Sequence, residues 1–122
     1  MMVLVVNGFL QEGRQTRLER ERTVEKWLGD RLRKNGFLYF KFVSPQNPGM
    51  PDRLIICPDG EVVFAELKTE VGRLSRQQQV CIDDLRRHGQ RVAVVKGMDE
   101  ARYFAQQMIQ IHTEGGGELG EV

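Results

Sequence analysis

The sequence predicts an α/β domain in which a mixed β-sheet lies between helices on both sides, and three observations lead to this class. Two apolar runs, at residues 54–57 and 62–67, flank the dipeptide Asp59-Gly60, which is typical of a β-hairpin turn. Apolar residues recur at helical spacing in three other stretches. A strand, a helix and a strand with short links imply a right-handed crossover and a parallel pair. The predicted order is helix, three strands, helix, strand, helix, and 122 residues fit one such domain.

The first helix is expected at residues 16–34. Thr16 can serve as its N-cap, and Asn35-Gly36 is a favourable C-terminal stop. Its apolar positions are about one turn apart and share one face with the neighbouring Trp27: Val24, Leu28 and Leu32. Glu21 and Glu25 are also one turn apart and share another face, which is either a solvated surface paired with arginines or part of a site.

The first strand is expected at residues 37–43, where alternation gives one strongly apolar face. Residues 44–49 are rich in Pro, Asn and Gly and therefore form a loop. Lys41 and Ser44 lie near the strand end that leads into this loop, just before Asp52. The loop is either a substrate-contacting element or an ordinary connection, and the composition favours neither.

The hairpin is the stretch around which the chain is organised. A tight turn at Asp59-Gly60 would place Arg53 opposite Glu66, with Asp52 beside it. Since strand side chains alternate, Glu66 and Lys68 point the same way. Two carboxylates and one ammonium are therefore predicted at one end of an otherwise apolar ribbon.

The second half of the chain supplies the remaining elements. A helix from Arg76 to about His88 is expected, with Ser75 as N-cap. Residues 91–96 contain a continuous apolar run typical of a central strand covered on both faces. A last helix is predicted at about 99–111. The expected inner positions of the two helices are Val80, Cys81, Leu85 and Ile82 in the first, and Ala101, Phe104, Ala105 and Met108 in the second.

Composition limits the partners and the compartment. The formal net charge of +1 gives no strong global field, so any nucleic-acid binding depends on local basic patches. The two cysteines, Cys57 and Cys81, form no disulfide framework and are interpreted as buried apolar residues, which favours a reducing, cytoplasmic location. No segment reaches transmembrane length. Residues 1–15 are expected to be an N-terminal extension and residues 113–122 a disordered tail, and neither His88 nor His112 is expected to be catalytic.

The acidic end of the hairpin has two interpretations. Charges that leave water must pair or bind a metal, so Asp52, Glu66 and Lys68 form either a structural salt-bridge group or a metal site. The context favours the site, because Asp52 follows a rigid Gly-x-Pro turn and Glu66 emerges from a buried strand. Carboxylate ligands without a nearby His or Cys suit Mg²⁺ or Mn²⁺.

These motifs together resemble those of a known family. The order Gly49-x-Pro51-Asp52, Glu66-x-Lys68, Gly72-Arg73-Leu74-Ser75 and Gln78 is similar to that of the VRR-NUC branch of the PD-(D/E)xK nucleases. The resemblance runs from about residue 21 to about residue 98. It implies a restriction-endonuclease-like core and a nuclease domain at residues 16–112.

The resemblance also implies roles for individual residues in phosphodiester hydrolysis. Asp52, Glu66 and the backbone carbonyl of Leu67 would hold one or two Mg²⁺ or Mn²⁺ ions. Lys68 would orient water or stabilise the phosphate, and Gln78 would position either one. Glu21 or Glu25 would add a carboxylate from the first helix, and spacing does not decide between them.

The implied substrate is DNA, and several basic and polar residues are candidates for contacting its phosphates: Arg73, Arg76, Lys41, Ser44 and Arg17. Stand-alone members of the family resemble Holliday junction resolvases. The resemblance therefore implies structure-selective cutting of branched DNA, such as junctions or flaps, by a homodimer in a bacterial or phage-infected cell. Two alternatives remain: a catalytically silent DNA-binding module of the same fold, and a small interaction protein whose hairpin charges are merely paired.

Overall fold

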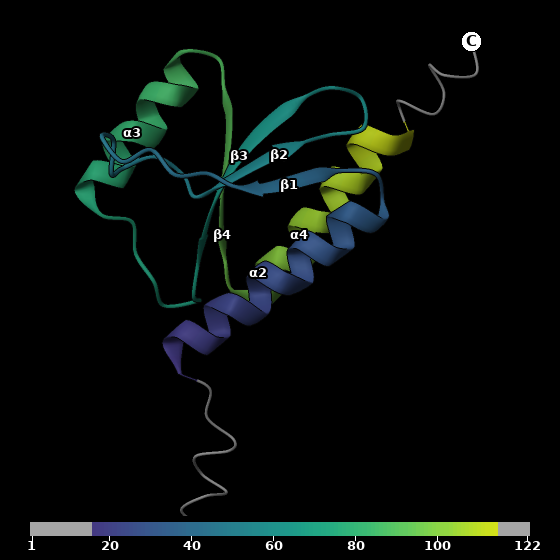
Figure 1. Cartoon of the computed structure of the whole chain (residues 1–122), viewed down its shortest axis with the longest axis horizontal. Coiled ribbons are helices and arrows are strands. Elements are labelled where there is room, and N and C mark those ends of the chain that lie inside the picture. The colour runs from purple at the N-terminus through teal and green to yellow at the C-terminus, as the bar shows by residue number, and fades with distance from the viewer. Residues whose placement is uncertain (1–15, 115–122) are drawn as a thin grey trace, which may run out of the picture.

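The computed structural model of the chain describes residues 16–114 and confirms the predicted class and order of elements. A four-stranded mixed sheet, in the order β1-β2-β3-β4, is flanked by helices on both sides (Figure 1). The elements are α2 (Arg17–Lys34), β1 (Leu38–Lys41), β2 (Arg53–Ile56), β3 (Val62–Lys68), α3 (Arg76–Arg87), β4 (Arg91–Lys96), α4 (Gly97–Ile109) and the π-helical turn η1 (Gln110–Glu114).

Helix α2 begins as its sequence predicts. The Thr16 hydroxyl accepts a hydrogen bond from the Glu19 amide (3.1 Å), and the Glu19 carboxylate accepts one from the Thr16 amide (2.8 Å), which completes a capping box. The last turn ends at Lys34 and is followed by Gly36, whose φ of 87° lies in the left-handed region that favours glycine.

The predicted register of the hairpin is wrong by one residue. Arg53 faces Ala65, not Glu66. The reason lies in the turn: the Gly60 amide donates to the Cys57 carbonyl (2.8 Å), and the Cys57 amide donates to the Glu61 carbonyl (2.8 Å). The loop thus has three residues, with glycine at a φ of 91°, in place of the expected two-residue turn.

Strand β4 differs from its prediction in one respect. It pairs in parallel with β3, from Val63 opposite Arg91 to Lys68 opposite Lys96, as the crossover rule predicts. It lies at the edge of the four-stranded sheet, however, and not in its centre. Its apolar run is still explained, because helices cover both faces: Val95 lies in the core beneath α2 and α4, while α3 packs on the opposite face.

The main core lies between the sheet and the helices α2 and α4, which are side by side on one face (Figure 1). It includes Leu28 and Leu32 of α2, Ile55 and Ala65 of the hairpin, and Ala105 of α4. Helix α3 covers part of the other face through the fully buried Ile82. The rest of its predicted inner stripe is less buried: Cys81 and Leu85 are half-buried, and the prediction is wrong for Val80, which is 50% exposed.

Several boundaries also differ from the predictions. The first strand is shorter than expected, and the last helix starts at Gly97 and continues as η1 through Thr113 and Glu114, which were expected in the tail. His112 of η1 is buried and accounts for this extension, since its ring bonds to the hairpin. The N-terminal extension and the remaining tail lie outside the described residues. Among residues 16–114, no helix has the length and apolar character needed to cross a membrane.

Candidate active site

The observed register places Asp52 and Glu66 opposite each other, one residue beyond the last pair of the β2–β3 ladder, Arg53 with Ala65. Asp52 Oδ1 accepts a hydrogen bond from the Leu67 amide at 3.3 Å. The carboxylate that follows the Gly-x-Pro turn is therefore tied to the strand that carries Glu66. The structure thus brings the two acids together more directly than the predicted register would have done.

Glu66 is the centre of the cluster. Its side chain is almost fully buried, and the residue is only 5% exposed. Its Oε2 lies 3.6 Å from Lys68 Nζ and accepts a hydrogen bond from Gln78 Nε2 at 3.1 Å. The predicted convergence of Glu66, Lys68 and Gln78 is therefore present in the structure.

Gln78 is held in place from two sides. Gln78 is the N3 residue of α3, and its Oε1 accepts a hydrogen bond from the Ser75 amide at 2.9 Å, within a capping box. Its Nε2 points to Glu66. The start of α3 and strand β3 are therefore coupled through one amide side chain, whereas the flanking Gln77 and Gln79 are exposed.

The two acids lie in an environment that disfavours their charged forms. Burial, followed by the charge of Asp52, raises the pKa of Glu66 to about 7, and Lys68 offsets this only in part. Burial also raises the pKa of Asp52, against the opposing effects of the Leu67 amide and Arg53. A divalent cation would stabilise both carboxylates, and their oxygen ligands fit Mg²⁺ or Mn²⁺.

The glycine of the Gly-x-Pro-Asp motif has a steric role. A Cβ atom at Gly49 would lie 2.3 Å from the backbone oxygen of Gln77, far inside van der Waals contact. Glycine thus lets the loop pack directly on α3. The fully buried Pro51 holds the backbone in place just before Asp52. Asp52 is positioned by this contact between the loop and the helix that carries Gln78.

The two helix glutamates differ in their surroundings. Glu25 is half-buried, pairs with Arg53 at 2.8 Å, and acts electrostatically on Asp52. Glu21 pairs with Arg17 at 3.8 Å, and among residues 16–114 no hydrogen bond or ion pair links it to Asp52 or Glu66.

Sequence reasoning gave Arg53 no role beyond that of a strand partner. Its side chain is 12% exposed, and its guanidinium lies 5.1 Å from the centre of the Tyr39 ring. Because Arg53 directly follows Asp52 and pairs with Glu25, it links helix α2 to the strand end that carries the acid. The only sequence signal was its position directly after the acid.

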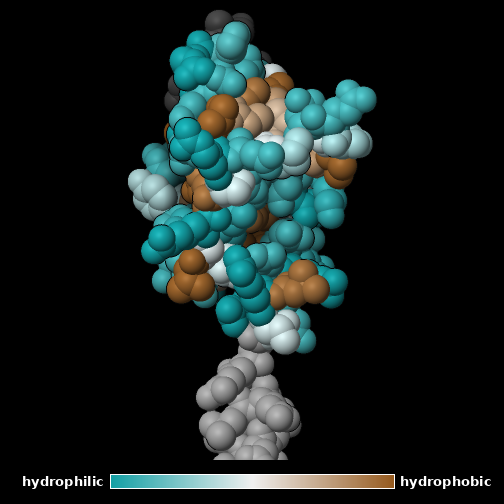
Figure 2. Space-filling model, turned by 90° about the vertical axis from the view of Figure 1, so that its left-hand side faces the viewer, coloured by the Kyte–Doolittle hydropathy of each residue, from teal (hydrophilic) through white to brown (hydrophobic). Residues whose placement is uncertain are grey.

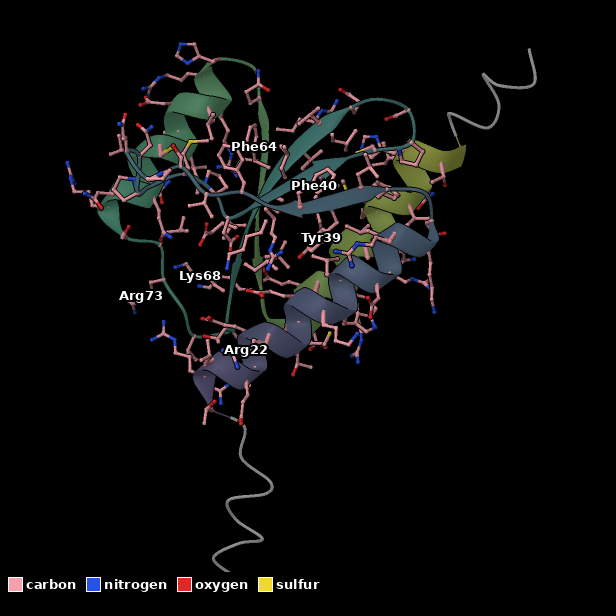
Figure 3. All side chains as sticks on the ribbon, in the orientation of Figure 1. Arg22, Tyr39, Phe40, Phe64, Lys68 and Arg73 are labelled. Atoms are coloured by element: carbon pink, nitrogen blue, oxygen red, sulfur yellow. The ribbon has the colours of Figure 1, made fainter. Side chains whose placement is uncertain are left out.

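The candidate DNA-binding residues are exposed or half-buried. Arg73, Arg76 and Lys41 are exposed, and Lys41 faces Arg53 across the end of β1. Arg17 is exposed beside Glu21, and Ser44 is half-buried, with its hydroxyl accepting a hydrogen bond from Asn47 (3.0 Å). Lys68 and Arg73 extend toward the same side of the molecule (Figure 3). That side is mainly hydrophilic, with separated apolar spots (Figure 2).

Comparisons with known proteins agree on one family. The sequence model of the VRR-NUC domain matches residues 9–99. The chain is 48% identical over 52 residues to putative nuclease p44 of Acyrthosiphon pisum secondary endosymbiont phage 1, a match that covers 43% of this chain and 56% of that relative. The chain thus spans little more than half the length of this curated relative.

Two solved structures share the fold. One, described as a VRR_NUC domain, superposes with a TM-score of 0.67 at 27% identity, covering 71% of this chain and 95% of its own. The other, a VRR_NUC domain protein, gives a TM-score of 0.60 at 21% identity and covers 79% of this chain and 89% of its own.

Proposed function

Because the chain belongs to the VRR-NUC family of nuclease domains, we propose that it is a divalent-metal-dependent endodeoxyribonuclease that cuts branched DNA. The observation that carries this proposal is the convergence of a buried acid, Glu66, with the half-buried Asp52 and with Lys68. Such a cluster has a high electrostatic free energy until a cation enters it. A purely structural ion pair would not need a second, partly buried carboxylate beside the first.

The metal ligands in this proposal are the carboxylates of Asp52 and Glu66 and the backbone carbonyl of Leu67. Mg²⁺ or Mn²⁺ bound there would supply an activated water and neutralise charge that develops on the phosphate. The Leu67 amide already fixes Asp52, so the geometry of the acids is set before any ion arrives. This preorganisation lowers the cost of assembling the site.

Lys68 and Gln78 complete the chemistry without binding metal. Lys68 Nζ lies 3.6 Å from Glu66, and its positive charge would stabilise the negative charge that develops on the scissile phosphate. Gln78 holds Glu66 through a hydrogen bond and presents an amide to the water or phosphate. Both side chains are positioned by elements of the fold, β3 and the capped start of α3.

We assign the additional helix carboxylate to Glu25, because it is the helix glutamate that acts on Asp52. Glu25→Gln should lower the cleavage rate about 10-fold to 100-fold, the range typical of residues that support a metal site. Glu21→Gln, the matched control one turn away, should stay within about threefold of the wild type. Initial cleavage rates at saturating Mg²⁺ measure both, and a larger loss for Glu21→Gln would reverse the assignment.

DNA contact in this proposal comes from the basic residues around the site. Arg73 and Arg76 flank the loop that follows Lys68, and Lys41 and Arg17 approach from β1 and α2, with Ser44 on the adjoining loop. Exposed arginines and lysines bind phosphates without reading bases. Recognition of DNA shape, as at a Holliday junction or a flap, is consistent with such a site.

A homodimer is proposed from the open part of the sheet. Leu38 and Phe40 of the edge strand β1 are 52% and 48% exposed, and Val62 of β3 adds to the same face. Figure 3 shows Phe40 and Phe64 on the side of the sheet opposite to Tyr39. Burying this apolar face would favour pairing of two copies.

Phe40→Ser should shift the protein from dimer to monomer in sedimentation equilibrium, because it replaces an exposed apolar side chain on this face with a polar one. A wild-type protein that stays monomeric at high concentration would contradict the dimer.

The proposed function is tested by a panel of four-way junction, flap and linear duplex DNA with Mg²⁺, Mn²⁺ or a chelator. Cleavage of branched substrates that requires a metal supports the proposal. Equal cleavage of linear duplex would remove the structure selectivity, and cleavage in the chelator would remove the metal dependence. Binding of DNA without cleavage under any condition would identify a silent module instead.

A further inference from the structure

A second cluster of potential metal ligands lies at the opposite end of the hairpin from Asp52 and Glu66. It combines Cys57 at the end of β2, Asp59 in the turn and His112 in η1. The cysteine sulfur, one carboxylate oxygen and one imidazole nitrogen all lie within 4.8 Å of one another. We propose that these three residues bind a transition-metal ion of the Zn²⁺ type, at a site separate from the nuclease centre.

Two of the three side chains in the cluster are buried. Cys57 is 3% exposed and His112 is 2% exposed, whereas Asp59 is the residue open to solvent. His112 Nδ1 lies 2.8 Å from Asp59 Oδ2, and the ring packs edge-on against Phe37. The contacts with Phe37 and Asp59 restrain the imidazole ring, so its Nδ1 atom stays directed at the hairpin turn.

The fold has a local feature that brings His112 to this place. The chain leaves α4 through the π-helical turn Gln110–Glu114, a rare geometry that is frequent at functional sites. His112 and Asp59 are separated by 53 residues in sequence. The cluster therefore joins the C-terminal helix to the hairpin turn.

The donor set distinguishes this cluster from the proposed Mg²⁺ site. Sulfur, imidazole and a single carboxylate are ligands for Zn²⁺ and similar ions, whereas Mg²⁺ prefers oxygen alone. Ligand atoms that share one Zn²⁺ lie about 3–4 Å apart, because each is about 2.0–2.3 Å from the ion. The three ligand atoms lie within 4.8 Å of one another, so they would have to approach slightly to share an ion, with a water in the fourth position.

Cys57 offers a buried sulfur atom that no other group in residues 16–114 engages. Among these residues, the sulfur has no hydrogen-bond partner and forms no disulfide. A bound metal would displace the thiol proton and be coordinated by the thiolate.

The metal would have a structural effect. It would link the hairpin turn to the C-terminal helix, at the end of the hairpin opposite to Asp52 and Glu66. The free energy of unfolding would therefore rise with the logarithm of the Zn²⁺ concentration. The Asp59–His112 pair alone would give no such dependence on Zn²⁺.

The test measures Zn²⁺ bound per chain by equilibrium dialysis, after removal of metals and with excess Mg²⁺ to occupy the oxygen-donor site. The full chain should bind one Zn²⁺, and Co²⁺ in its place should give a thiolate-to-metal charge-transfer band. Cys57→Ser should abolish the band and, like His112→Gln, weaken Zn²⁺ binding by more than about 10-fold. The chain offers matched controls, because Cys81→Ser and His88→Gln alter its other cysteine and other histidine and should leave binding unchanged.

Glu66→Gln separates this site from the proposed function, since it should leave Zn²⁺ binding intact in excess Mg²⁺. Loss of Zn²⁺ binding in Glu66→Gln, or equal binding by Cys57→Ser, would overturn the second site. The absence of a thiolate–Co²⁺ band in the wild type would also overturn it, without reference to any variant. If the chain showed no nuclease activity, the proposed function would fail, but the measurements of Zn²⁺ binding and of the Co²⁺ band would still test the second site.

Discussion

Glu66→Gln should reduce DNA cleavage at least about 10³-fold, because it removes a negative charge that a divalent ion needs while keeping the shape of the side chain. Gln78 can still donate a hydrogen bond to the new amide oxygen, so the link from β3 to α3 is retained. The loss should therefore be chemical and not structural. Initial rates on a four-way junction, with Mg²⁺ or Mn²⁺ titrated to saturation, measure it.

The control is Glu61→Gln, on the same hairpin but at its exposed end, where Glu61 pairs with Arg91 at 3.1 Å. This variant should cleave at the wild-type rate. Calorimetric titration with Mn²⁺ should show weaker binding for Glu66→Gln and unchanged binding for Glu61→Gln. Robust cleavage by Glu66→Gln would refute the assignment of Glu66 as a metal ligand.

Without metal, the wild-type protein should lose about 3 kcal/mol of folding stability as the pH rises from about 4.5 to above 7. The pKa of Glu66 is raised from 4.5 in the unfolded chain to about 7 in the folded one, mainly by burial and then by the charge of Asp52. In this window the folded state holds a proton that the unfolded state has released, so stability decreases with rising pH. Each pKa unit corresponds to about 1.4 kcal/mol, which gives the magnitude.

Urea unfolding in a chelating buffer at several pH values between 4 and 8 measures this effect. Glu66→Gln has no proton to lose at this position, so its stability should vary less with pH and should exceed that of the wild type at pH 8. Mn²⁺ should restore the stability of the wild type at high pH but not raise that of the variant by the same amount. A wild-type stability that is constant or increases from pH 5 to 8 would contradict the buried, raised-pKa glutamate.

The two predictions have one physical origin. Carboxylates that are held together in a partly dry environment destabilise the empty fold, and the same arrangement binds a cation tightly. Activity and stability are therefore expected to change in opposite directions at Glu66. A salt bridge that served only the fold would change both in the same direction, or would change stability alone.

Much of the architecture could be predicted from local patterns. The capping residues Thr16 and Ser75, the glycines that follow α2 and α3 and the apolar periodicities determine where these elements begin and end. Strand alternation alone places Glu66 and Lys68 on one side. These features depend on residues within a few positions of one another, so the chain order is sufficient to read them.

The details of the site depend on contacts that sequence spacing does not specify. A three-residue loop in place of a two-residue one shifted the register and brought Asp52, not Arg53, opposite Glu66. The way α2 crosses the sheet brings Glu25 to Arg53, and no spacing along the chain specifies that contact.

The sequence by itself determined the class of fold, the hairpin and the set of candidate acids, because short-range sterics and periodic burial act within each segment. Only the tertiary structure decided that β4 lies at the sheet edge and that His112 bonds to Asp59. Both depend on how separate elements pack. The pairing of residues 53 positions apart is selected by the burial of the whole core and by no pattern near either residue.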